Sequence, residues 1–67
     1  MSIAKVTEIS STSEVSFDDA VARGIERASK SLRHLKSAWI KESNVDISDG
    51  KVTAYRVNMM VTFVLDE

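Results

Sequence analysis

Few residues in this 67-residue chain could carry out a reaction. It contains no cysteine and one histidine, which excludes disulfides, thiol catalysis, thiolate metal sites and a His-rich zinc site within one chain. The hydroxyl residues at 10–13, three serines and one threonine, have no adjacent base and form no nucleophile elbow. We find no catalytic constellation, and we therefore expect a protein that binds a ligand and is not an enzyme.

Two side chains are chemically suited to hold a ligand. Trp39 offers an aromatic platform for a planar molecule, and Arg56 could hold a phosphate or carboxylate through paired donors or stack on an aromatic plane. Each also has a plainer interpretation. Trp39 could fill a subunit contact, and Arg56 could form an intersubunit salt bridge with Glu42, Asp46 or Glu67.

Neighbouring residues could extend such a site. Ser37 and Lys41 share the face of Trp39, because side chains alternate along a strand, and they line the same pocket unless they simply face solvent. Three acidic residues are weak candidates for a hard-cation site, because symmetry turns one carboxylate into a ring: Glu42, Asp46 and Asp49. The alternative for these three is a solvated polar edge.

One helix is the clearest element that could position these groups. Apolar residues recur at intervals of three and four, which stacks them on one helix face. They are Phe17, Val21, Gly24, Ile25, Ala28, Leu32 and Leu35. Ser16 followed by Asp19 resembles a capping box, so the pattern predicts a helix from Ser16 to Leu35.

Strands are predicted on both sides of the helix. Residues 3–9 read as a strand, followed by a polar break at 10–13. Residues 37–47 form a second strand whose apolar phase slips after Ile40, which indicates a bulge. Asp49-Gly50 predicts a tight turn into a long strand at 51–65. The expected fold is α+β: a β-α-β-β unit with a three-stranded sheet in the order 1-3-2 and the helix across one face.

A chain this small needs further burial. Residues 1–67 form a single domain that hides only roughly 60% of its unfolded surface. The second face of the sheet carries Trp39, Met60 and Val64, which are too apolar for open water. We therefore expect copies of the chain to cover that face.

The charge balance limits the other partners. Nine Lys and Arg against ten Asp and Glu give a net charge of −1, so we expect no nucleic acid and no anionic membrane as partner. The sequence shows no membrane span and no signal-peptide pattern, and we expect a cytoplasmic protein.

The whole chain resembles the dodecin family. The resemblance rests on Thr12-Ser13, on ASKSLRHL at 28–35, and on YRV at 55–57 with VTFVLDE at 61–67, all at unbroken spacing. It implies a hollow homododecameric shell in which each sheet wraps around its helix. It also implies binding of a flavin, riboflavin or FMN, at subunit contacts, for storage or sequestration of this cofactor.

The two flavin-contacting positions of the family differ here. The resemblance puts a stacking Trp at Ser37 and a hydrogen-bonding Gln at Arg56. Trp39 lies two residues beyond Ser37, which returns it to the same face about 6–7 Å away. We therefore expect a shell that stores flavin or a related planar ligand on Trp39, with Ser37, Lys41 and Arg56 around it. The alternative is a flavin-free assembly that binds metal ions or another anionic ligand.

Overall fold

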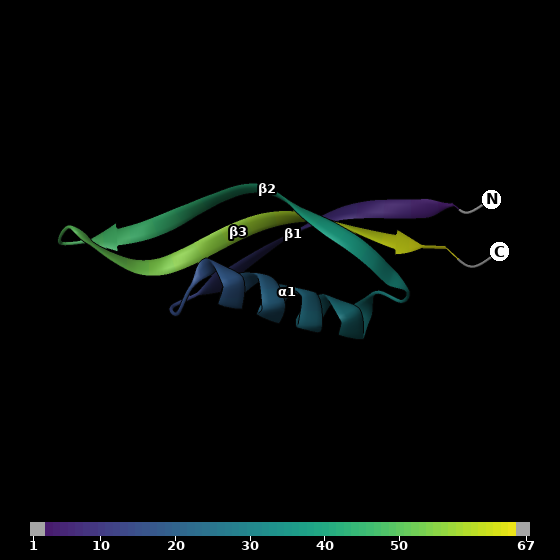
Figure 1. Cartoon of the computed structure of the whole chain (residues 1–67), viewed down its shortest axis with the longest axis horizontal. Coiled ribbons are helices and arrows are strands. Elements are labelled where there is room, and N and C mark those ends of the chain that lie inside the picture. The colour runs from purple at the N-terminus through teal and green to yellow at the C-terminus, as the bar shows by residue number, and fades with distance from the viewer. Residues whose placement is uncertain (1–2, 66–67) are drawn as a thin grey trace.

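A single three-stranded antiparallel sheet carries one helix on one of its faces (Figure 1). The computed structural model describes residues 3–65. Its elements are β1 (Ala4–Ser13), α1 (Phe17–Ser31), β2 (Leu35–Ser48) and β3 (Lys51–Val64). The strand order is β1-β3-β2, and β3 pairs antiparallel with both neighbours. The predicted β-α-β-β unit and its 1-3-2 order are confirmed.

Small residues let the helix approach the sheet closely. Ala20, Gly24 and Ala28 are the buried residues of α1, and α1 packs on β1 and β3. A Cβ atom added to Gly24 would lie 2.8 Å from Cε of Met59 and 2.9 Å from Cβ of Ser11. Glycine is therefore required here by close packing.

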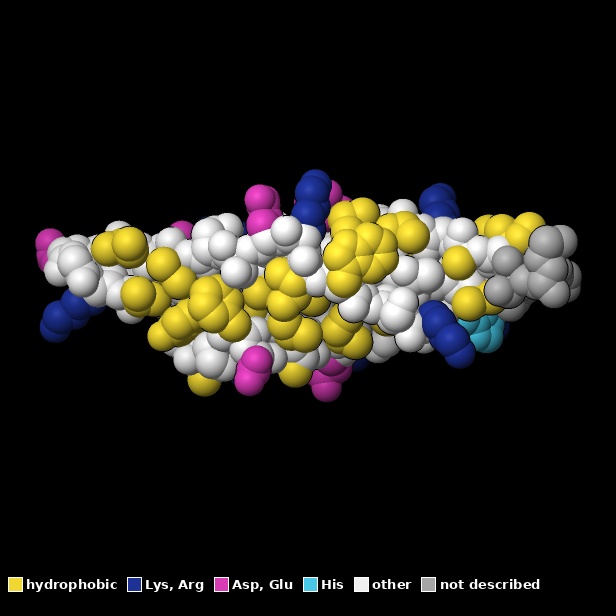
Figure 2. Space-filling view, turned by 45° about the horizontal axis from the view of Figure 1, so that its top comes forward, with side chains coloured by type: hydrophobic (Ala, Val, Ile, Leu, Met, Phe, Trp, Pro, Cys, Tyr) yellow, Lys and Arg dark blue, Asp and Glu magenta, His cyan; other side chains and the backbone are white. Residues whose placement is uncertain are grey.

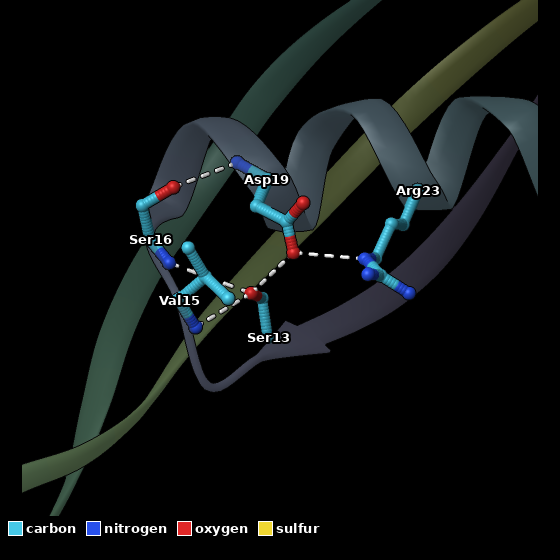
Figure 3. A network of polar contacts seen from close by, with 5 residues as sticks. All are labelled: Ser13, Val15, Ser16, Asp19 and Arg23. Carbon is cyan, nitrogen blue, oxygen red and sulfur yellow. Dashed lines mark hydrogen bonds and ion pairs between the residues drawn. The ribbon is translucent and has the colours of Figure 1, made fainter.

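Hydrogen bonds around two serines fix the start of the helix (Figure 3). Ser16 is the N-cap, and its hydroxyl accepts from the Asp19 backbone N–H at 3.0 Å, as predicted. The carboxylate of Asp19 accepts from the Ser13 hydroxyl at 2.6 Å and from Nε of Arg23 at 2.9 Å. Ser13 Oγ in turn accepts from the backbone N–H groups of Val15 and Ser16. Ser13 thus ends β1 and anchors α1.

The helix ends four residues before the predicted boundary. Leu32 leaves the helix with extended dihedrals, and its N–H closes the last turn on the Ala28 carbonyl at 2.8 Å. His34 then takes a positive φ of 61°, and Leu35 pairs with Phe63 in the sheet. Pairing with β3 therefore outweighs the helical spacing of Leu35.

The first strand is longer than predicted, and the polar break at 10–13 is wrong. These residues belong to β1 and pair with Asn58 through Tyr55 of β3. Ser11 occupies the narrow space beneath Gly24, and Ser13 is only 5% exposed. Small hydroxyl side chains thus fit a tight part of the sheet that larger apolar residues would overfill.

The predicted turn and bulge are confirmed. Asp49 and Gly50 both have positive φ, 51° and 73°, and Ser48 pairs with Lys51 across this two-residue loop, as in a type I′ turn. The pairing register shifts between Ile40 and Glu42, where the apolar phase predicted a bulge. Further shifts occur at Leu35/Ser37 and Asp46/Ile47.

The chain is elongated and exposes much of its surface. Its extents are 52 × 19 × 14 Å and its radius of gyration is 13.8 Å, where a compact chain of this length would have about 11 Å. Its accessible surface is 4898 Å², against about 4,200 Å² for a typical folded monomer of this mass. Figure 2 shows hydrophobic side chains in a band along one side. Over both faces of the chain, the large exposed hydrophobic residues are Ile3, Val6, Val15, Phe17, Trp39, Ile40, Ile47, Val52 and Leu65.

Among residues 3–65, we find no helix with the length and hydrophobicity of a membrane span.

Candidate functional site

The face of the sheet turned away from α1, here called the open face, carries the candidate site. Residues directly paired across antiparallel strands share a face, so the register defines four rows from β1 through β3 to β2. The rows are Thr12–Arg56–Asn44, Ser10–Asn58–Glu42, Glu8–Met60–Trp39 and Val6–Thr62–Ser37. Trp39, Ser37 and Arg56 therefore share the open face, as the sequence predicted.

Trp39 is the aromatic residue of this face. It is 51% exposed and pairs with Met60, which is half-buried on the central strand. The indole next to a thioether makes an apolar surface suited to a planar ring. Ser37 pairs with Thr62 in the neighbouring row, so two hydroxyl side chains border this surface.

Lys41 lies in the bulge between Ile40 and Glu42 and reaches across the central strand. Its ammonium group is 3.3 Å from Oε1 of Glu8 on β1, and both side chains are about half exposed. This ion pair joins the outer strands at the level of Met60, which pairs with Glu8. Lys41 thus lies beside the Trp39 surface with its charge already balanced.

Arg56 is held by groups of its own chain. Its Nη1 and Nη2 donate to the two carboxylate oxygens of Asp46 at 2.9 and 2.8 Å. Nε donates to the Thr12 hydroxyl at 3.2 Å, and Nη1 also donates to Oδ1 of Asn44 at 3.0 Å. Arg56 on β3 therefore ties β1 to β2. The salt bridge to Asp46 that the sequence suggested between subunits forms within one chain.

Electrostatics reinforce this contact. Hydrogen bonds from Arg56, followed by its charge, lower the pKa of Asp46, while desolvation opposes them. The same carboxylate raises the pKa of Arg56. Both groups therefore stay charged near neutral pH and favour the bidentate geometry.

The three acidic metal candidates do not meet within one chain. Asp46 holds Arg56, Glu42 accepts from Nδ2 of Asn58 at 2.9 Å, and Asp49 lies in the hairpin turn. Among residues 3–65, no three His, Cys, Asp or Glu side chains come together as a metal site in one chain. A ring of such carboxylates would need several copies of the chain.

Sequence reasoning missed two residues of the open face. Asn58 lies in the row between those of Arg56 and Trp39, and Glu8 lies in the row of Trp39. Both bind side chains of β2. The alternation of β3 already placed Asn58 on the face of Arg56. The contact of Glu8 with Lys41 depends on the register of β1, which the sequence did not reveal.

Another hollow lies on the helix side of the chain. It measures about 640 Å³ and runs between α1 and β1, where its lining includes Ile9, Ser11, Arg23, Arg27 and Leu32. Trp39 is not part of this groove. Its lining includes none of the other predicted ligand residues, Ser37, Lys41 and Arg56, either, so we base the candidate site on the open face.

Comparison with known proteins identifies the family. The family model described as Dodecin matches residues 3–66. The chain belongs to the dodecin family. Dodecins form homododecamers and act as binding and storage proteins.

Relatives extend this match over the whole fold. The chain is 36% identical to the dodecin of Thermus thermophilus over 63 residues, which covers 94% of this chain and 91% of that protein. It is also 36% identical to the calcium dodecin of Mycobacterium tuberculosis over 64 residues, which covers 94% and 89%. The structure of dodecin from Streptomyces davaonensis superposes with a TM-score of 0.93 at 36% identity, covering 98% of this chain and 97% of that one.

Proposed function

We propose that this chain is a storage protein that sequesters a flavin, riboflavin or FMN, or a related planar ligand at the subunit interfaces of a homododecamer. The observation that carries the proposal is Trp39, a half-exposed indole beside Met60 on the open face. An exposed tryptophan on the face of a sheet can stack on a planar ring and lose little side-chain entropy.

The shape of the chain supports self-association. Its accessible surface exceeds that of a typical monomer of its mass by roughly 700 Å². Exposed apolar side chains such as Trp39, Val6 and Leu65 occupy part of that surface. Subunit contacts would remove them from water and would enclose the Trp39 surface between copies.

The experiment is a titration of riboflavin fluorescence with the assembled protein. Stacking on Trp39 should quench the flavin, and Trp39→Ala should weaken binding about tenfold to a hundredfold, since aromatic stacking contributes ~1–3 kcal/mol. The matched control is Ile40→Ala. Ile40 is the next residue, is 52% exposed, and lies on the opposite face. Undiminished fluorescence with an intact assembly would exclude flavin storage.

The alternative is a flavin-free assembly that binds metal ions or another anionic ligand. Ser37 and Arg56 at the two flavin-contacting positions favour it, as does the relative named calcium dodecin. Calorimetric titration with calcium separates the two functions. The alternative would be supported if the wild-type protein binds calcium with a measurable heat, if Glu42→Gln abolishes this heat, and if riboflavin fluorescence stays undiminished.

A cytoplasmic location remains a prediction, which cell fractionation would test.

A further inference from the structure

Arg56 is a poor partner for the polar edge of a planar ligand. A guanidinium has five N–H groups and no acceptor. Nε, both hydrogens of Nη1 and one of Nη2 are directed to Thr12, Asn44 and Asp46. One N–H remains, and the charge is balanced by Asp46. An edge that presents both a donor and an acceptor finds no matching acceptor here.

The next row of the open face contains Asn58, whose carboxamide has both a donor and an acceptor. Asn58 donates from Nδ2 to Oε1 of Glu42 at 2.9 Å. Because an ionised carboxylate only accepts, this contact fixes which end of the carboxamide is the NH₂ group. The second N–H and the Oδ1 atom of Asn58 make no hydrogen bond with another side chain in the part of the chain that the structure describes.

Asn58 is also close enough to serve a ring on Trp39. Met60 pairs with Trp39, and Asn58 lies two residues away on the same strand and face. Diagonal neighbours of this kind are roughly 7–8 Å apart. A fused aromatic ring system that stacks on Trp39 and covers Met60 therefore reaches the Asn58 carboxamide with its edge.

We propose that Asn58 determines the ligand specificity of the Trp39 surface by reading an imide or lactam edge. Its Oδ1 accepts from the ring N–H, and its free Nδ2–H donates to the adjacent ring carbonyl. Glu42 is a positioning residue, because its hydrogen bond turns the carboxamide so that both groups stay available. The ligand class is a planar heterocycle whose ring is uncharged and carries adjacent N–H and C=O groups. This inference rests on the proposed function.

The test compares riboflavin with 3-methylriboflavin, in which a methyl group blocks the ring N–H. Wild-type protein should bind riboflavin about tenfold more tightly, the effect of one good hydrogen bond whose partner is otherwise unsatisfied. Asn58→Val, a good strand former, should bind both flavins with equal affinity. Glu42→Ala should reduce the preference, and Glu42→Gln should restore it by supplying a neutral acceptor.

The matched control is Thr53→Val, at an exposed position of the same strand, five residues from Asn58 and outside the four rows of the open face. It should keep the wild-type preference, and size-exclusion chromatography should show each variant assembled. If Asn58→Val keeps the preference while Trp39→Ala loses binding, the role of Asn58 is overturned and the proposed function stands. If wild-type protein binds neither flavin, both are overturned.

Discussion

Met59 and Met60 are adjacent in the sequence and lie in opposite environments. Met59 is 1% exposed beneath α1, where it packs with Ala20 and Val57. Met60 lies on the open face between Glu8 and Trp39 and is half-buried. The covered face packs against the chain's own helix along β1 and β3. The open face is organised by polar pairs that link the strands and leave Trp39 accessible.

The difference shows how one strand serves two purposes. The covered face stabilises the single chain through dense packing around Gly24. The open face has charged and amide pairs that link its strands, such as Arg56 with Asp46 and Asn58 with Glu42. Such exposed pairs add little stability, but they fix the positions of side chains around a ligand surface. We therefore expect stability and binding to respond to different substitutions.

Removing the buried methionine should have the largest effect on stability. Met59→Ala should lower the free energy of unfolding by about 2–5 kcal/mol, because it removes buried contacts and leaves a cavity. Met60→Ala is the matched control and should cost less. Urea denaturation at equal subunit concentration measures both, since association contributes to apparent stability. Equal losses would mean that the two faces are equally buried in the assembly.

A larger side chain at the helix–sheet contact should cause the second-largest loss of stability. Gly24→Val places its Cβ within 3 Å of Met59 and Ser11, and overpacking of this kind costs about 1–3 kcal/mol. Ala22→Val, on the exposed side of α1, is the control for the presence of a valine in this helix, since valine has a higher helix propensity than the glycine that it replaces at position 24. Thermal unfolding should show a clear loss for the first variant alone. An equal loss in both would refute the close-packing explanation.

Loss of the Ser13 hydroxyl should have an intermediate effect. Ser13→Ala removes the acceptor for the Val15 N–H and the donor to Asp19, at a cost of about 1–2 kcal/mol typical of lost caps. Ser13→Thr keeps the hydroxyl and should recover part of the stability. Denaturant midpoints check both. An unchanged midpoint for Ser13→Ala would show that water replaces the hydroxyl.

The smallest effect should be a change in acid sensitivity. Arg56 lowers the pKa of Asp46 below its usual 3.8, so the folded state holds its proton less tightly than the unfolded state. The resulting stability is fully present above the unfolded pKa and is lost as the pH falls through the folded pKa. Between about pH 6 and about pH 3, wild-type protein should therefore lose more stability than Asp46→Asn.

A second carboxylate with a lowered pKa, that of Asp19, lies in the first turn of α1. The Ser13 hydroxyl, with a further contribution from Arg23, lowers its pKa. Asp19→Asn should flatten the acid response in the same direction as Asp46→Asn. Parallel pH profiles for wild type and both variants would show that other groups control the acid response.

The sequence was sufficient for the order of the strands, the hairpin turn and the face of Trp39. Local signals carry these features: helical spacing, Asp49-Gly50, and strict alternation in β3. It was insufficient where long-range pairing decides. Leu35 pairs with Phe63 in the sheet, although its spacing matched the apolar face of the helix. Ser11 lies in β1 beneath Gly24, where there is room only for a small side chain.

The candidate site was predictable to a similar extent. Trp39, Ser37 and Arg56 fall on the open face by alternation alone. The intrachain contact of Arg56 with Asp46 and the reach of Lys41 to Glu8 depend on the register of three strands and on a bulge. No local pattern specifies those.

The hydroxyl of Ser13 also determines where the chain tolerates inserted residues. Because it bonds both to the turn at Val15 and to the first turn of α1, an extra residue at 14–16 would slide the helix along the sheet and part Gly24 from Met59. The tip at Gly50, with open space around it, imposes no such limit. Natural or engineered insertions should accumulate at that end of the molecule.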